Sequence, residues 1–240
     1  MAEYLFPLRM KCEIAEGIMA FWFDTTGQKF TFKPGQHADY TLLNPGETDE
    51  KGNTRTFSFA SSPDFRGFMI ATRMRGSAFK NYLKSMPLGT KVKVSTPYGD
   101  LALHKDESKP AVFMAGGIGI TPFRSIIEWA MKNAPNRKLY LFYSNKSRQD
   151  SAFLDDLEKW SQENPNFRLV ATVTREEDPS WPHERGRIDA NMLKKHLGGD
   201  IQESVYYVAG PPAMVEAMTE TLTGMGVDED RIKKEEFAGY

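Results

Sequence analysis

The stretch Met114-Ala115-Gly116-Gly117-Ile118-Gly119-Ile120-Thr121-Pro122-Phe123 joins an apolar run to a segment with helical spacing. The run 111–115, AVFMA, has the composition of a buried strand, and 122–133 places apolar residues on one helical face. Glycines allow unusual backbone angles and close approach, while threonine and proline suit a helix cap and first turn. Since a helix N-terminus attracts phosphate, the stretch predicts a ligand-binding turn; a tight turn without a ligand is the alternative.

A second stretch, YYVAGPPAMVEAM at 206–218, repeats the plan of strand, glycine-proline turn and helix. Here Gly210 and Pro211 follow the strand, and Met214 lies in the first part of the helix. Ligands of open α/β sheets bind at the carboxyl ends of the strands. We therefore expect the two turns to frame one nucleotide-binding crevice.

The second half of the chain alternates strand-like and helical segments. The runs AVFMA, KLYLFYS, RLVATVT and SVYYVA alternate with helical patterns near 122–133, 151–163, 188–197 and 211–224. This alternation predicts a parallel sheet covered by helices on both faces. The polar break LHKDESKP at 103–110 suits a linker, so we place an α/β domain at 105–240.

The first half, 1–104, is typical of an all-β domain. Its segments IMAFWFDTTGQKFTF, HADYTLLNPGE, TRTFSFASSP and GFMIATR are aromatic and β-branched and are broken by turn residues. This pattern predicts an antiparallel β-barrel or sandwich. One helix interrupts it at 77–86, with Ser77 placed as its N-cap.

Composition excludes several classes of protein. The 240 residues describe an ordinary globular chain with no apolar run long enough for a membrane span, and we expect a cytoplasmic monomer. Cys12 is the one cysteine and is expected to be buried, so no disulfide, zinc cage or iron-sulfur cluster can form within this sequence. Residues 1–105 carry 14 Lys and Arg against 10 Asp and Glu, which suits an acidic partner, but no dense basic run suggests nucleic acid. The four histidines show no metal spacing.

Four ordered blocks make the chain resemble the ferredoxin-NADP reductase family. They are RTFSFASSP at 55–63, GSAFKNYL at 76–83 with PYGD at 97–100, GGIGITP at 116–122, and AGPPAMV at 209–215 with the ending EEFAGY. The resemblance covers nearly the whole chain. It implies an N-terminal antiparallel β-barrel that binds FAD, with FMN less expected, and a C-terminal domain that binds NADPH or NADH.

The resemblance also implies roles for single residues of the first domain. Arg55 would neutralise the flavin pyrophosphate, Phe57 stands where relatives usually stack a tyrosine on the flavin ring, and Ser58 would hydrogen-bond flavin N5. Ser77 and Ala78 would begin a helix that holds the second phosphate. The remaining residues expected along the flavin are Thr56, Ala71, Arg73, Met74 and Gly76.

In the second domain the resemblance places residues of both turns beside the nicotinamide nucleotide. These are Gly116, Gly117, Gly119, Thr121, Pro122, Gly210, Pro211 and Met214. Ala209 stands where many relatives have a cysteine, which should slow hydride transfer without preventing it. Ser144, Lys146, Arg148 and Arg175 follow two strands and favour NADPH over NADH, because cationic and hydroxyl groups suit a 2′-phosphate.

The C-terminal residues complete the expected active site. A terminal aromatic side chain covers the flavin in the family and a glutamate lies nearby, which suggests Tyr240 and Glu236, with Phe237 and Glu235 as alternates. The implied reaction passes hydride from NAD(P)H to FAD and then single electrons to ferredoxin, flavodoxin or an oxygenase component. The alternative is a non-catalytic electron-transfer or regulatory nucleotide-binding subunit of a larger complex.

Overall fold

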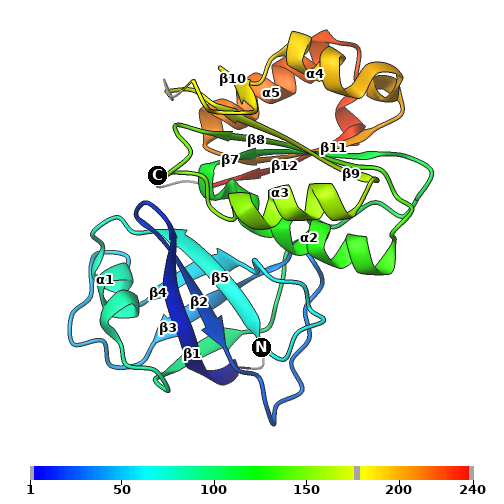
Figure 1. Cartoon of the computed structure of the whole chain (residues 1–240). Helices are drawn as coiled ribbons and strands as arrows, with labels where there is room; N and C mark the ends of the chain where they lie inside the picture. Colours follow the sequence, from blue (N-terminus) through cyan, green and yellow to red (C-terminus); the bar gives the residue numbers. More distant parts are fainter. Residues whose placement is uncertain (1–2, 176–178, 238–240) are drawn as a thin grey trace. The chain divides into compact units, whose positions relative to one another are not determined.

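The computed structural model describes residues 3–175 and 179–237 of the chain. By packing, these divide into two compact units (Figure 1), the first formed by Met1–Ala102 with Thr121–Trp129 and the second by Leu103–Ile120 with Ala130–Tyr240. Each unit contains one six-stranded sheet. Among the described residues, no helix combines the length and the apolar character needed to cross a membrane.

The sheet of the first unit is antiparallel, with strand order β4-β3-β6-β1-β2-β5. Its strands are β1 (Glu3–Ala15), β2 (Ile18–Phe23), β3 (His37–Leu42), β4 (Thr54–Ser58), β5 (Phe68–Arg73) and β6 (Lys91–Ser95). Helix α1 (Ala78–Ser85) follows β5, and its N-cap Ser77 accepts a hydrogen bond from the backbone N–H of Lys80. The predicted antiparallel class and the cap at Ser77 are therefore confirmed.

The sheet is barrel-like but not closed, since β4 and β5 are edge strands without a shared ladder. Strand β4 ends at Ser58, and beyond it the Ala60 backbone N–H donates to the Met69 carbonyl at 2.7 Å. The Ser61 hydroxyl then accepts from the Met69 N–H at 3.0 Å. The Ser61 side chain therefore bonds the Met69 N–H, which in a closed barrel would donate to the backbone of a neighbouring strand.

Aromatic rings fill the interior of the first unit. Phe6, Phe23, Phe59 and Phe68 are buried and contact one another at edge-to-face or stacked angles. Tyr40 lies among them, and its hydroxyl is buried without a hydrogen-bond partner in the described part of the chain. Since alternate strand residues point to opposite faces, the residues between these rings form the outer face of the sheet.

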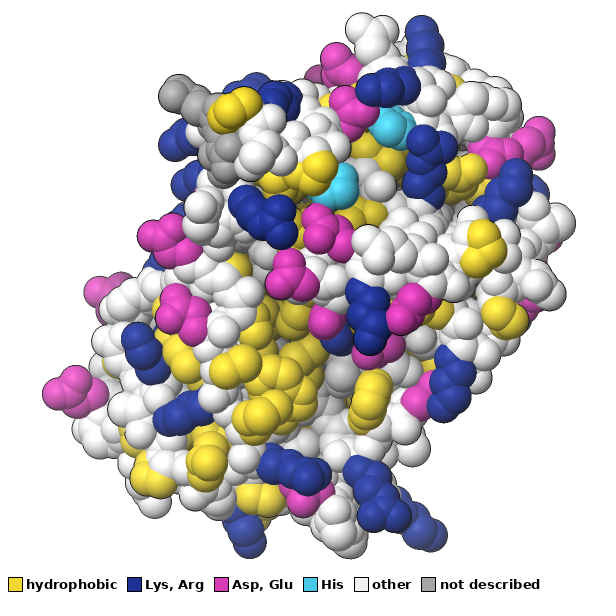
Figure 2. Space-filling model, viewed as in Figure 1, with side chains coloured by type: hydrophobic (Ala, Val, Ile, Leu, Met, Phe, Trp, Pro, Cys, Tyr) yellow, Lys and Arg dark blue, Asp and Glu magenta, His cyan; other side chains and the backbone are white. Residues whose placement is uncertain are grey.

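The expectation that Cys12 is buried is wrong. Cys12 is exposed on β1, where it pairs with Ala20 on β2, and Met10 on the same face of β1 pairs with Trp22 and is 47% exposed. The sequence pattern did not show which face of this long strand points outward. Figure 2 shows hydrophobic side chains gathered over this part of the first unit, while basic and acidic groups are interspersed elsewhere on the visible face.

The sheet of the second unit is entirely parallel, with strand order β10-β9-β8-β7-β11-β12. Its strands are β7 (Ala111–Gly116), β8 (Leu139–Asn145), β9 (Phe167–Val173), β10 (Glu184–Arg185), β11 (Val205–Gly210) and β12 (Ile232–Glu236). Helix α3 (Leu154–Glu163) lies on one face, and α4 (Ala190–Leu197) and α5 (Pro212–Gly224) lie on the other (Figure 1). The predicted parallel sheet covered on both faces is confirmed, although α3 and α4 begin later than expected.

Helix α2 (Ile120–Asn133) follows a short 3-10 turn, η1 (Gly117–Gly119). Its N-cap is Gly119, which makes no side-chain cap, so Thr121 and Pro122 are the second and third residues of the helix rather than its cap and first residue. The predicted cap at Thr121 is therefore wrong. The tighter turn starts the helical backbone before the threonine is reached, and Thr121 is only 2% exposed.

The first turns of α2 belong to the first unit through contacts with the segment after β4. Arg124 donates to the Ala60 carbonyl at 2.8 Å, and the Ser125 hydroxyl donates to the Ser61 carbonyl at 2.7 Å. The Ser62 backbone N–H donates to the Glu128 carboxylate at 2.6 Å. The end of the block at 55–63 thus contacts helix α2 through residues 60–62, whereas the beginning of the block forms strand β4.

Candidate functional site

Strand β4 carries the residues expected at the flavin ring and phosphate. Alternation places Arg55 and Phe57 on one face, opposite Tyr40 and Ala38 of β3. The Phe57 ring lies 5.6 Å from that of Tyr40 and 5.8 Å from that of Phe79 on α1. Arg55 and Phe57 are thus brought together with the start of α1.

The Arg55 side chain is already held by groups of its own chain. One terminal nitrogen donates to the carbonyls of Lys51, Gly52 and Thr54 at 2.7 to 3.0 Å. The other donates to the carboxylate of Asp49. The guanidinium carbon lies 5.3 Å from the centre of the Phe79 ring. These contacts fix the cation at the first turn of α1.

Further basic residues surround this helix start. Burial lowers the pKa of Lys80, and repulsion from Arg75, Arg55 and Lys51 lowers it further. The Lys80 ammonium donates to the Arg73 carbonyl at 2.8 Å. We call the four basic side chains and the first turn of α1 the α1 anion site. Four cations that act on the start of one helix favour a phosphate.

Of the residues at the α1 anion site, the sequence predicted Arg55 and Ser77. It did not point to the others, which are Lys51, Arg75, Lys80 and Asp49. Lys80 could have been found, because it lies in the first turn of a predicted helix whose N-cap is Ser77. Asp49 gave no such signal. It lies on the turn between β3 and β4, and only the folded chain carries its carboxylate to Arg55.

Ser58, at the end of β4, is 3% exposed, and its hydroxyl has no hydrogen-bond partner among the described residues. An unpaired buried hydroxyl costs about 1–3 kcal/mol, so a group that pairs with it would be stabilised there. Thr56 differs, because its hydroxyl donates to Asp39 at 2.5 Å. Ser58 therefore fits a hydrogen-bonding ligand atom, and Thr56 is occupied by its own chain.

The other residues expected along the flavin lie on β5 and the segment that leads to α1. Ala71 is buried opposite Ala20, the carbonyl of Arg73 accepts from Lys80, and Met74 packs against the aromatic core. At Gly76 a Cβ atom would meet nothing within 4 Å. This open place lies directly before Ser77.

In the second unit, the two glycine turns touch each other. A Cβ atom at Gly119 would lie 2.4 Å from the Ala209 carbonyl oxygen, and one at Gly116 would lie 2.4 Å from the Met214 sulfur. The close approach that these two glycines allow is therefore made by the chain itself. Gly117 differs, because it has a φ of +54° and open space where its side chain would be. Of the three glycines, Gly117 is the one suited to an approaching ligand.

Strand β12 brings C-terminal residues beside the second turn. Glu236 pairs with Gly210, and the Phe237 backbone N–H donates to the Gly210 carbonyl at 3.1 Å. Pro211 caps α5 at the same place. Glu236 is exposed. Tyr240, expected over the flavin ring, lies outside the described residues.

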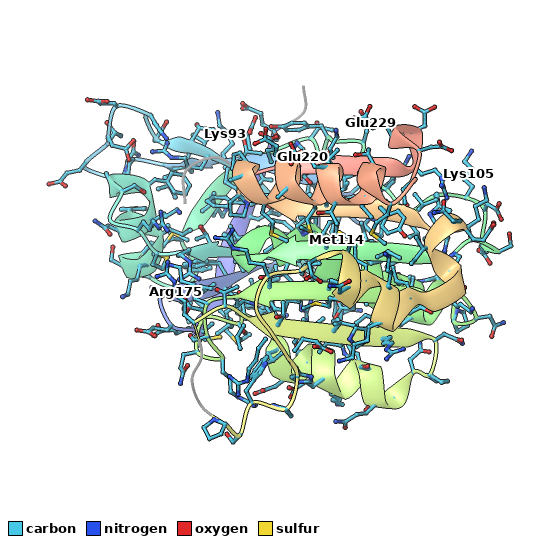
Figure 3. The ribbon with its side chains drawn as sticks, turned by 90° about the horizontal axis from the view of Figure 1, so that it is seen from above. Lys93, Lys105, Met114, Arg175, Glu220 and Glu229 are labelled. Carbon is cyan, nitrogen blue, oxygen red and sulfur yellow. The ribbon has the colours of Figure 1, made fainter. Side chains whose placement is uncertain are left out.

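The residues expected to choose between NADPH and NADH lie at the carboxyl ends of β8 and β9. Ser144 is on β8, while Lys146, Arg148 and Arg175 are exposed on the following loops. Arg148 pairs loosely with Asp155 at 3.7 Å. Figure 3 places Arg175 and Lys105 at opposite ends of the strands of the second sheet.

Asn145, the last residue of β8, belongs to the polar and basic run at 144–148 that favours NADPH, but the sequence suggested no separate role for it. It is 7% exposed, and its side-chain oxygen has no hydrogen-bond partner in the described segments. Its backbone carbonyl accepts from the N–H and hydroxyl of Thr174. A buried acceptor at the carboxyl end of a parallel strand suits a hydroxyl or amide of a ligand.

Comparison with known proteins agrees with this arrangement. Residues 113–220 match the model of the oxidoreductase NAD-binding domain family. The chain is 27% identical to NADH-cytochrome b5 reductase 1 of Aspergillus terreus over 241 residues, covering 94% of this chain and 79% of the relative. These likenesses support the resemblance of this chain to the ferredoxin-NADP reductase family. The resemblance of the four sequence blocks is thereby confirmed.

The chain spans about three fifths of the length of some relatives that it matches. It is 26% identical to reductase component 2 of terephthalate 1,2-dioxygenase from Comamonas sp, covering 84% of this chain but 58% of the relative. Among solved structures, a ferredoxin NADP+ reductase from Neisseria gonorrhoeae with bound FAD and NADP has a TM-score of 0.80 at 21% identity and covers 98% of both chains. That likeness supports the two-unit fold.

Proposed function

We propose that this chain is a flavin-dependent NAD(P)H oxidoreductase that holds FAD on its first unit and the nicotinamide dinucleotide on its second. The observation that carries the proposal is the buried hydroxyl of Ser58, which has no partner among the described residues and lies on the strand that also presents Arg55 to the α1 anion site. One strand thus offers a hydrogen-bonding group for a ring and a cation for a phosphate. A flavin held by these residues would supply the acceptor for a hydride from reduced nicotinamide and a store from which electrons leave one at a time.

The residues of the first unit suit this cofactor chemically. A guanidinium offers paired donors to phosphate oxygens, and the first turn of α1 supplies backbone N–H groups with the same preference. A serine hydroxyl both donates and accepts, so Ser58 suits a ring atom whose protonation changes during the reaction. The Phe57 ring adds an apolar surface for the flavin. Unlike a tyrosine, it offers no hydroxyl there.

In the second unit, Gly117 leaves room for the dinucleotide beside the start of α2, and Gly210 and Pro211 form the neighbouring wall. Glu236 is in our proposal the carboxylate that exchanges protons with solvent. The domain division at 104 and 105, with FAD assigned to the first part and nucleotide to the second, remains part of this proposal.

We further propose that the electrons pass to a separate redox protein, such as a ferredoxin, a flavodoxin or an oxygenase component. One relative is named as the reductase component of propane 2-monooxygenase from Rhodococcus jostii. The excess of basic over acidic residues in 1–105 suits an acidic partner and would speed its association.

A visible spectrum of the purified chain tests the proposal directly. We expect a yellow protein that bleaches when NADPH or NADH is added without oxygen. A colourless protein that takes up no FAD would contradict the flavin assignment. A yellow protein that neither nucleotide bleaches would instead support the non-catalytic subunit.

The choice of nucleotide is tested by neutral substitutions at Lys146 and Arg148. Both side chains are exposed beyond β8, where a 2′-phosphate would be held by cations, so we propose NADPH as the preferred donor. The double variant Lys146→Gln/Arg148→Gln should raise the KM for NADPH about tenfold and leave the KM for NADH nearly unchanged. Lys132→Gln on α2 is the matched control. Equal effects on both nucleotides would refute the phosphate assignment.

A further inference from the structure

The carboxylate of Asp49 occupies the place that the proposed function gives to a flavin phosphate. It accepts a charge-assisted hydrogen bond from Arg55, and the Lys51 backbone N–H donates to it at 3.0 Å. The hydrogen bond from Arg55 is the largest cause lowering the pKa of Asp49, and the Phe79 backbone N–H at the start of α1 contributes in the same direction. An anion therefore already sits between the guanidinium and the helix start.

The turn that carries Asp49 is built to place it there. The Gly52 backbone N–H donates to the Asp49 carbonyl at 2.8 Å, and Gly52 has a φ of +67°. Arg55 donates to the carbonyls of Lys51 and Gly52 on the same turn. The turn and the cation hold each other, so the turn can move only if Arg55 exchanges its partners.

A phosphate and this carboxylate cannot share the site at low cost. Both are anions, and two like charges in contact repel each other, whereas either one alone is stabilised by the same donors. The Asp49 side chain is 28% exposed, so it can turn outward into water when a stronger anion arrives. The pyrophosphate of FAD as a whole carries more charge and more acceptor oxygens than one carboxylate, which favours the exchange.

We propose that Asp49 is a built-in substitute for the flavin phosphate, holding Arg55 in the flavin-free chain and leaving the α1 anion site when flavin binds. The inference rests on the proposed function, since it needs a flavin phosphate at this site. Its consequence is a flavin that binds less tightly than the four cations alone would allow. Asp49 thereby sets how readily the chain gains and loses its cofactor.

The test compares Asp49→Asn with the wild-type full chain after removal of flavin. Titration with FAD, followed by quenching of flavin fluorescence, should show about tenfold tighter binding in the variant, because one competing charge-assisted contact is gone. Riboflavin, which carries no phosphate, should bind both proteins equally. Glu50→Gln, an exposed neighbour on the same turn, is the control for loss of one negative charge and should not change the affinity for FAD.

A second measurement follows the turn itself. The Lys51 amide donates to the Asp49 carboxylate, so hydrogen exchange at that amide should become faster when FAD binds the wild-type chain. In the Arg55→Ala background, Asp49→Asn should no longer tighten FAD binding, because the two residues act on one site.

The outcomes separate this inference from the function on which it rests. If the wild-type chain binds FAD and Asp49→Asn binds it equally or more weakly, the inference is overturned and the proposed function stands. If neither protein binds any flavin, both are overturned. Tighter FAD binding by Asp49→Asn, with riboflavin unchanged, supports both.

Discussion

At the scale of single residues, the first unit contains two buried hydroxyls without partners in the described chain. The surroundings of the two hydroxyls differ, and so does the reason that each is unpaired. Ser58 lies at the end of β4 beside the residues expected to hold flavin, so its lack of a partner is consistent with a ligand. Tyr40 lies within the aromatic core, where Phe23, Phe59 and Phe68 surround its ring. Burial raises the pKa of Tyr40 well above its usual value.

Tyr40→Phe should therefore stabilise the protein. Removing a buried hydroxyl that makes no hydrogen bond relieves a desolvation penalty on the order of 1 kcal/mol, while the ring keeps its contacts. The free energy of unfolding of the first unit, measured in urea, checks this. Tyr82→Phe on α1 is a control for loss of a hydroxyl from a partly buried ring. A loss of stability in Tyr40→Phe would mean that the hydroxyl has a partner, such as a buried water.

At the scale of elements, the turn that opens α2 shows how neighbouring glycines serve different needs. The sequence predicted a strand, a glycine turn and a helix at 111–133, and β7, η1 and α2 confirm it. It could not predict that β11 approaches Gly119 and that α5 approaches Gly116, since these contacts join segments about 90 residues apart. Only Gly117 has the positive φ that local turn chemistry leads one to expect.

Substitution by alanine should separate these roles. Gly119→Ala would push a Cβ atom to 2.4 Å from the Ala209 carbonyl, and backbone cannot yield as a side chain can. We expect a loss of about 3 kcal/mol or more in the stability of the second unit from this overpacking. Gly117→Ala meets no atoms, and its left-handed backbone should cost about 1 kcal/mol. Urea unfolding of both variants measures the difference, and equal losses would contradict the assignment.

Helix α1 and the turn before β4 show the same contrast between what the sequence predicts and what only the folded chain shows. Ser77 was predicted as an N-cap from its place before an amphipathic pattern, and the structure confirms it. The contact between Asp49 and Arg55 depends on how the chain folds back between β3 and β4. Neither local propensity nor hydrophobic spacing contains that information, because side-chain pairing across a turn follows from its three-dimensional path.

At the scale of the whole molecule, acid should affect the second unit through His104. Its backbone N–H donates to the Tyr207 hydroxyl at 2.7 Å, and its ring nitrogens lie 2.9 Å from the same hydroxyl and 3.1 Å from the Lys109 carbonyl. A neutral ring satisfies this pattern by accepting at Nδ1 and donating at Nε2. Burial, with repulsion from Arg137, lowers the pKa of His104 to about 4.

The lowered pKa of His104 determines whether acid raises or lowers the stability of the fold. An unfolded histidine has a pKa of about 6.5, so between that pH and about 4 the unfolded chain binds a proton that folded His104 does not. Stability should be fully present above pH 6.5 and fall as the pH drops. His104→Gln should lose less stability than wild type between pH 7 and pH 4.5 in urea unfolding. His183→Gln, whose ring contacts Glu158, should not reduce this acid sensitivity; an unchanged slope in His104→Gln would contradict the prediction.

The sequence alone determined the two kinds of unit, the main alternation of strands and helices in the second unit and the resemblance to the family, because hydrophobic periodicity, turn residues and caps are local properties of the chain. It also placed Arg55, Ser58 and both glycine turns where ligands would be sought. The tertiary structure decided which of these groups are already satisfied: Asp49 holds Arg55, β11 and α5 fill the space beside Gly119 and Gly116, and Ser58 has no partner in the described chain. The groups beside the two glycines come from segments distant in sequence, and Asp49, six residues before Arg55, reaches it through the path of the turn between β3 and β4, so that in both cases only folding makes the contact.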